Sequence, residues 1–146
     1  MFGRKSYTQE ELDNSKAAIK LQLGAYETFV EALAKATKAT PDKAVASARE
    51  AFEPLFFNNL TLVLDRHFIH RLRIVTGKDS NPLNEVEMLS DSLMNNNGVL
   101  RGNNVIKWVP DDTVVKLAIG DSIRLTAEEF GRLSTAFHAE IERKFV

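Results

Sequence analysis

The amino-acid sequence predicts an α+β fold that is predominantly helical, with about four helices and a small antiparallel β-sheet, a hairpin or three-stranded meander, before the C-terminal helix. Two periodicities support this prediction. Apolar residues recur at intervals of three and four through most of residues 8–97, which is the period of a helix with one buried face. Between residues 104 and 126 the period shortens to two, which is typical of strands. The length of 146 residues suits one domain, 1–146.

The first helix is predicted over residues 9–38. Thr8 and Glu11 have the spacing of a capping box, in which each side chain can bind a free backbone N–H at the helix start. One apolar stripe follows, formed by Ile19, Leu23, Tyr26, Val30 and Leu33. Residues 1–7, which precede the cap, are expected to form a flexible N-terminus.

A second helical region is predicted to start at Thr40 and Pro41, because proline is well tolerated in the first turn of a helix. Its apolar stripe continues to Ile74, and Pro54 predicts a kink or break near residues 51–54. Asn81 and Pro82 predict the start of another helix, which ends near Met94. The short connection between them makes residues 55–75 and 82–96 an expected antiparallel helix pair.

The predicted sheet occupies residues 104–126. Val105, Ile106 and Trp108 suggest its first strand, and residues 113–119 and 122–125 suggest two more strands joined by a tight turn at Gly120 and Asp121. A second capping box, Thr126 with Glu129, then starts a C-terminal helix over residues 127–146.

Composition excludes several classes of protein. Lys and Arg total 19 against 20 Asp and Glu, and this balance makes nucleic acid an unlikely partner. The absence of cysteine excludes disulfides, thiolate metal sites and cysteine nucleophiles. The first residues contain no apolar run typical of a secretory signal, and no stretch approaches 18 apolar residues. We therefore expect a cytoplasmic protein with no membrane association and no cofactor.

The segment from Arg66 to Asp91 carries the highest density of ionisable groups near a predicted core. If one helix winds regularly from Pro54 to Val75, His67 and His70 share its apolar face. Arginine side chains nearby could hold a carboxylate or phosphate. The candidate residues for binding a ligand or a small anion are Arg66, His67, His70, Arg73, Lys78 and Glu85.

A metal site is not expected here, and its weak candidates are His67, His70 and Glu85. The chain lacks the His-Glu-x-x-His motif of zinc proteases and the Glu-x-x-His motif of di-iron bundles. A structural interpretation remains open for the same residues. The histidines could bind facing carboxylates, and the arginines could form ion pairs with Glu85, Glu87 and Asp91.

The function that fits these patterns is a non-enzymatic binding or protein-interaction domain that forms oligomers. The apolar stripe of the first helix, or the edge of the sheet, could mediate self-association. One alternative is a small metal- or anion-dependent enzyme that uses the His67 and His70 cluster. The second is a winged-helix-like DNA-binding regulator, which the acidic residues Glu85, Glu87 and Asp91 on its would-be reading helix disfavour.

Three segments resemble a family of small uncharacterised bacterial proteins: Arg66 to Leu89, Val105 to Trp108, and Gly120 to Phe145. The resemblance covers roughly the last 80 residues. It implies a freestanding small bacterial domain, and it assigns no activity and no catalytic residue.

Overall fold

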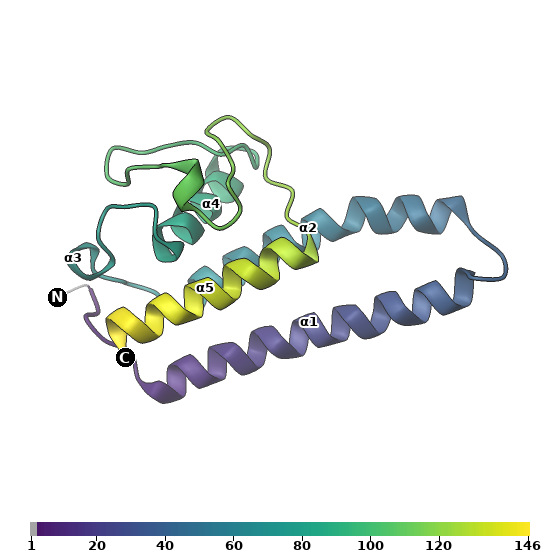
Figure 1. The fold of residues 1–146 in the computed structure, drawn as a ribbon, viewed down its shortest axis with the longest axis horizontal. Helices are drawn as coiled ribbons and strands as arrows, with labels where there is room; N and C mark the ends of the chain where they lie inside the picture. Colours follow the sequence, from purple (N-terminus) through teal and green to yellow (C-terminus); the bar gives the residue numbers. More distant parts are fainter. Residues whose placement is uncertain (1–2) are drawn as a thin grey trace.

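The computed structural model describes residues 3–146, and over these residues the chain is helical (Figure 1). The elements are α1 (Gln9–Thr37), α2 (Lys43–His67), α3 (Arg73–Thr76), α4 (Pro82–Asn95), a 3-10 turn η1 (Pro110–Asp112) and α5 (Ala127–Phe145). Helices α1 and α2 form a long hairpin. Helices α4 and α5 pack at one end of it, and the other end projects beyond the rest of the molecule (Figure 1).

The predicted α+β fold class is wrong, because residues 3–146 contain no β-strand. The segment expected to form a sheet is an irregular loop around η1, with one isolated bridge between Val99 and Ser122 beside it. Part of this segment still packs on the core, since Ile106, Val115 and Ile123 are buried, whereas Val105 and Ile119 are exposed. The alternation of apolar residues therefore indicates local burial, without the strand pairing that usually accompanies it.

Side chains of the helices satisfy the backbone of this loop in place of a neighbouring strand. Ser80 Oγ donates to Lys107 O (2.6 Å) and accepts from Val109 N–H (2.7 Å). Asn58 Nδ2 donates to Ile123 O (2.8 Å). Buried backbone polar groups need partners of some kind. Here the partners are Asn58 of α2, Glu85 of α4 and Ser80 before α4.

Local capping signals locate most helix starts. The Thr8 and Thr126 capping boxes are present as predicted, and α1, α4 and α5 match their predicted ranges within a few residues. Helix α2 begins after the predicted Thr40–Pro41 start, because Asp42 caps it by accepting from the N–H groups of Ala44 and Val45. It also continues through Pro54 without the predicted break.

One aromatic core joins the elements. Phe57 and Phe68 from the α2 side and Phe130 and Phe137 from α5 are fully buried and lie with ring centroids about 6 Å apart in the pairs Phe57–Phe130 (6.0 Å) and Phe68–Phe137 (5.8 Å). A single shared core is what one domain requires. The core occupies only one end of the α1–α2 hairpin, since no side chain between residues 20 and 56 is buried.

The N-terminal segment that was expected to be flexible makes specific contacts over residues 3–7. Tyr7 is buried, its ring packs on Phe68 (centroids 5.1 Å apart), and its hydroxyl donates to Ile69 O (2.6 Å). The backbone N–H of Arg4 donates to His70 O, and the carbonyl oxygen of Arg4 accepts from Leu72 N–H. The segment therefore closes over the end of the core, while residues 1 and 2 lie outside the described residues.

Candidate functional site

The predicted helix from Pro54 to Val75 is not continuous, so His67 and His70 do not share a face. Helix α2 ends at His67, and His70 lies in the following turn with a left-handed backbone (φ 62°) and an exposed side chain. Arg71 explains the ending. Its guanidinium donates to the carbonyl oxygens of Phe68 (2.9 Å) and Asp65 (3.4 Å), which a helix end leaves free, and it also pairs with the Asp65 carboxylate (2.8 Å).

The cationic candidates share no bonding partner in the described residues. Arg66 and Lys78 are exposed. Arg73 is occupied within the fold, where it donates to Asn84 Oδ1 (2.7 Å) and to Glu87 Oε2 (2.5 Å) and so links α3 to α4. The ion-pair interpretation of the sequence therefore describes Arg73 correctly.

Glu85 is buried and accepts two backbone hydrogen bonds, from Val114 N–H (2.7 Å) and Val115 N–H (2.9 Å). Burial raises the pKa of this carboxyl group, and the two N–H groups counteract that rise. The carboxylate thus anchors the loop after η1 to α4. Among the hydrogen bonds of the described residues, none joins Glu85 to His67 or His70.

A different group of residues does come together. Ser15 Oγ lies 2.8 Å from His67 Nδ1 and 2.8 Å from His138 Nε2, which joins α1, α2 and α5. We call this set the serine–histidine bridge. A hydroxyl group has one hydrogen, so Ser15 can donate to only one ring, and the other ring can donate an N–H to Ser15. The ring that accepts from Ser15 is uncharged.

Burial keeps both imidazoles of the bridge neutral. It lowers the pKa of His138 to about 4, and the charge of Lys16 and electrostatic coupling to His67 lower this pKa further. It also lowers the pKa of His67. The sequence carries a signal for this bridge, because Ser15 interrupts the apolar stripe between Leu12 and Ile19, both of which are buried. Its partners are far away in the sequence, so periodicity could not identify them.

The serine–histidine bridge resembles a nucleophile beside a base, but its surroundings favour a structural role. Ser15 is 3% exposed, and it lies inside α1, where the backbone N–H groups that could stabilise an oxyanion are used by the helix. Within residues 3–146 no group of three or more His, Asp or Glu side chains could hold a metal ion.

The most unusual surface belongs to the projecting part of the hairpin, residues 20–56, which we call the arm. A groove of about 650 Å³ runs between its helices and is lined by apolar side chains of both, among them Tyr26, Phe29, Phe52 and Phe56. The Phe29 side chain is 57% exposed and that of Phe52 is 48% exposed. Large apolar side chains on this scale are rarely left to water without a reason.

The groove opens on a face of the arm that is formed by one stripe of residues on α1 and one on α2. Neither stripe contains a charged residue. At helical spacing beside the groove, α1 presents Leu21, Ala25, Phe29, Ala32 and Ala36, and α2 presents Ala44, Ala48, Ala51, Phe52 and Leu55. All ten are exposed. We call these ten residues the arm face.

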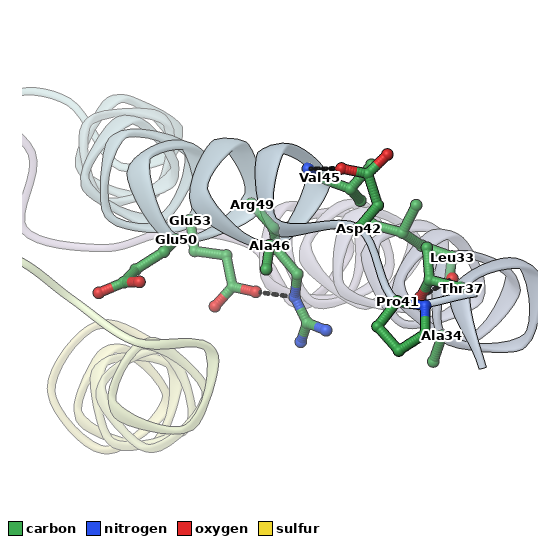
Figure 2. Close-up of a pocket in the computed structure, with 10 residues that line it drawn as sticks. All are labelled: Leu33, Ala34, Thr37, Pro41, Asp42, Val45, Ala46, Arg49, Glu50 and Glu53. Carbon is green, nitrogen blue, oxygen red and sulfur yellow. Dashed lines mark hydrogen bonds and ion pairs between the residues drawn. The ribbon is translucent and has the colours of Figure 1, made fainter. Parts of the chain in front are cut away.

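A second groove, of about 470 Å³, lies near the tip of the arm and is more polar (Figure 2). Asp42, Arg49, Glu50 and Glu53 contribute to its lining, and Figure 2 shows Arg49 paired with Glu53. Arg49 and Glu53 also border the apolar groove, where their charges offset each other. None of the ten arm-face residues lines this second groove, so Asp42 and Glu50 lie on a different side of the arm.

Comparisons of the chain with protein-family models, with curated proteins and with solved structures find no match. The resemblance to small bacterial proteins stays a prediction. No helix among residues 3–146 combines the length and apolar character needed to cross a membrane.

Proposed function

We propose that this protein is a non-enzymatic interaction module that associates with copies of itself through the arm. The observation that carries the proposal is the arm face, an exposed and uncharged surface on the arm, in which no side chain is buried. Most helical stability in proteins comes from packing one face against something else. The arm of a second copy supplies that packing through its own arm face.

Two arms placed face to face form a four-helix bundle. Its centre contains Phe29 and Phe52 from each copy, surrounded by alanines that let helix backbones approach closely. The contact is isologous, since each copy uses the same surface, and this is the commonest symmetry of soluble oligomers.

Neither alternative function gains support from the geometry. In the described residues no hydrogen bond or ion pair joins any two of the six candidate residues for a metal- or anion-dependent enzyme, and Arg73 and Glu85 are bonded to other residues of the fold. A winged helix needs a β-hairpin as its wing, and residues 3–146 contain none.

Replacing Phe29 with serine should weaken self-association about thirtyfold. The substitution removes a half-exposed ring from the centre of the proposed contact, and such a truncation costs about 2 kcal/mol of binding free energy. Sedimentation equilibrium of the wild type and the variant over a range of concentrations measures the effect. Circular dichroism checks that the helices persist.

Ile74→Ser is the matched control for this experiment. Ile74 is the most exposed large apolar residue of the described chain (86%), and it lies on α3, away from the arm. Its replacement should leave the mass unchanged. A wild-type protein that is monomeric at every concentration would contradict self-association, and so would equal effects of the two substitutions.

A further inference from the structure

We infer that the serine–histidine bridge tolerates one added proton, and that a second proton releases the first turns of α1, residues 9–19, from the core. The inference concerns how α1 is attached to the rest of the fold, and it does not depend on the proposed self-association. It comes from the hydrogen atoms available to the bridge, from the charged groups around it, and from the few buried side chains that hold α1.

The bridge keeps both of its hydrogen bonds with no added proton and with one. Ser15 Oγ lies 2.8 Å from His67 Nδ1 and 2.8 Å from His138 Nε2. When both rings are neutral, Ser15 donates to one ring and accepts an N–H from the other. If the donating ring gains a proton at its second nitrogen, it still donates to Ser15. One added proton therefore breaks no hydrogen bond of the bridge.

A second proton has no such place in the bridge. With both rings charged, both bridging nitrogen atoms carry hydrogen, and neither ring can accept from Ser15. These two nitrogen atoms lie at most about 6 Å apart, because each contacts the same oxygen. Two positive charges at this separation repel each other strongly when they are withdrawn from water. The doubly charged bridge is therefore unstable while it stays buried.

No carboxylate in the described residues pairs with either ring, so no negative charge offsets the second proton. The charged side chains beside the bridge are already paired or are positive. Glu142 of α5 pairs with Lys16 of α1 (3.8 Å), Asp65 of α2 pairs with Arg71 (2.8 Å), and Arg66 of α2 is exposed. Lys16 also lowers the pKa of His138. The surroundings therefore disfavour a second positive charge.

The two histidines differ in burial, and this difference sets the order in which they gain protons. His67 is half-buried, whereas the exposed fraction of His138 is only 6%. Burial lowers the pKa of both rings, and it brings that of His138 to about 4. His67 therefore takes the first proton and donates to Ser15, and His138 takes the second at lower pH.

Helix α1 is the element that leaves, because few buried side chains hold it. It buries only Leu12, Ser15 and Ile19, and Ser15 is the middle one of the three. Helices α2 and α5 stay joined through the rings of the aromatic core. A groove of about 830 Å³ between α1 and α5 is lined by Ile19 and His138. Widening this groove admits water to the charged His138 ring.

The arm does not depend on the bridge. Tyr26 of α1 packs on Phe56 (ring centroids 5.9 Å apart) and on Phe57 (4.7 Å) of α2, at the base of the arm. These contacts contain no group that titrates between neutral pH and pH 4. Residues 9–19 therefore detach as a segment, while the rest of α1 stays paired with α2.

Two measurements on the wild-type protein test the inference, from neutral pH to about one unit below the pKa of His138. NMR of the imidazole groups follows the protonation of each histidine, and amide hydrogen exchange follows the opening of each helix. Protection of residues 9–19, corrected for the intrinsic exchange rate at each pH, should fall about tenfold relative to α5 as His138 gains its proton. Release that accompanies the first proton would contradict the inference, and so would equal loss of protection in α1 and α5.

His138→Gln and His70→Gln form a matched pair of variants. Glutamine at position 138 presents an uncharged amide to Ser15, so only His67 can take a proton in the bridge, and residues 9–19 should stay protected throughout the same pH range. His70 is exposed and lies outside the bridge, and its replacement should leave the release as in the wild type. Acid release that persists in His138→Gln would overturn the inference.

Discussion

Replacing Glu85 with alanine is expected to lower the free energy of unfolding by about 3 kcal/mol. The carboxylate holds the N–H groups of Val114 and Val115, and Val115 is buried. Without Glu85 these two donors lose their partner, and each unsatisfied buried group costs about 1–3 kcal/mol. The loss is partly offset because the burial that raises the pKa of Glu85 already disfavours its charged form. Denaturant unfolding measures the change.

Two variants separate the hydrogen bonds from the rest of the side chain. Glu85→Gln keeps one acceptor oxygen and should lose about half as much stability. Glu87→Ala removes a neighbouring carboxylate of α4 that pairs with Arg73 at the surface, and it should cost less than about 1 kcal/mol. Faster amide exchange at Val114 and Val115 should accompany only the Glu85 variants. An alanine variant as stable as wild type would refute the anchoring role.

The serine–histidine bridge should make the fold sensitive to acid. The folded state keeps His138 neutral down to a pKa of about 4, whereas in the unfolded chain it takes up a proton near its ordinary pKa of 6.5. A group with a lowered folded pKa contributes stability that is present above 6.5 and lost as the pH falls towards 4. The difference corresponds to about 3 kcal/mol, and His67 adds a loss of the same sign.

His138→Gln tests this origin of the acid sensitivity, because glutamine presents an uncharged amide near the position of Nε2. The slope of unfolding free energy against pH between 6.5 and 4 should become shallower in the variant. The other charged groups near His138 are Lys16 of α1 and Glu142 of α5, which pair with each other (3.8 Å) and remain. An unchanged slope would show that groups other than His138 cause the acid sensitivity.

Glu85 contributes to the same pH profile with the opposite sign. Its folded pKa is raised, so its contribution to stability is present at low pH and is lost as the pH rises above the ordinary value of 4.5. The single variants Glu85→Gln and His138→Gln therefore change the pH profile in opposite directions, and the double variant should show the sum of the two changes.

The helices could be predicted from the sequence because their signals are local. The capping boxes at Thr8 and Thr126 and the cap at Asn81 act over three residues. The sheet could not be excluded in the same way. Alternating apolar residues around Ile106 and Val115 look like strands, and only partners far away in the chain, such as Ser80 and Asn58, complete the loop instead.

The candidate site depended on where α2 ends, and the sequence signal for that end was ambiguous. The apolar stripe continues to Ile74, but the contacts of Arg71 with Asp65 and Phe68 stop the helix at His67. Ser15 and His138 meet over a separation of 123 residues, which no local pattern encodes. The exposure of Phe29 and Phe52 could not be predicted either, because an apolar stripe in a sequence does not show whether another surface of the protein covers it.

The core holds only the first turns of α1 and the last turns of α2, where Leu12, Ile19, Phe57 and Leu64 are buried. The connection at residues 38–42 therefore lies far from every buried contact. Whole turns of helix could be added or deleted in matching amounts on both sides of that connection while the core stays intact. The length of the protrusion is thus free to vary in evolution and in engineering, with reach adjusted separately from stability.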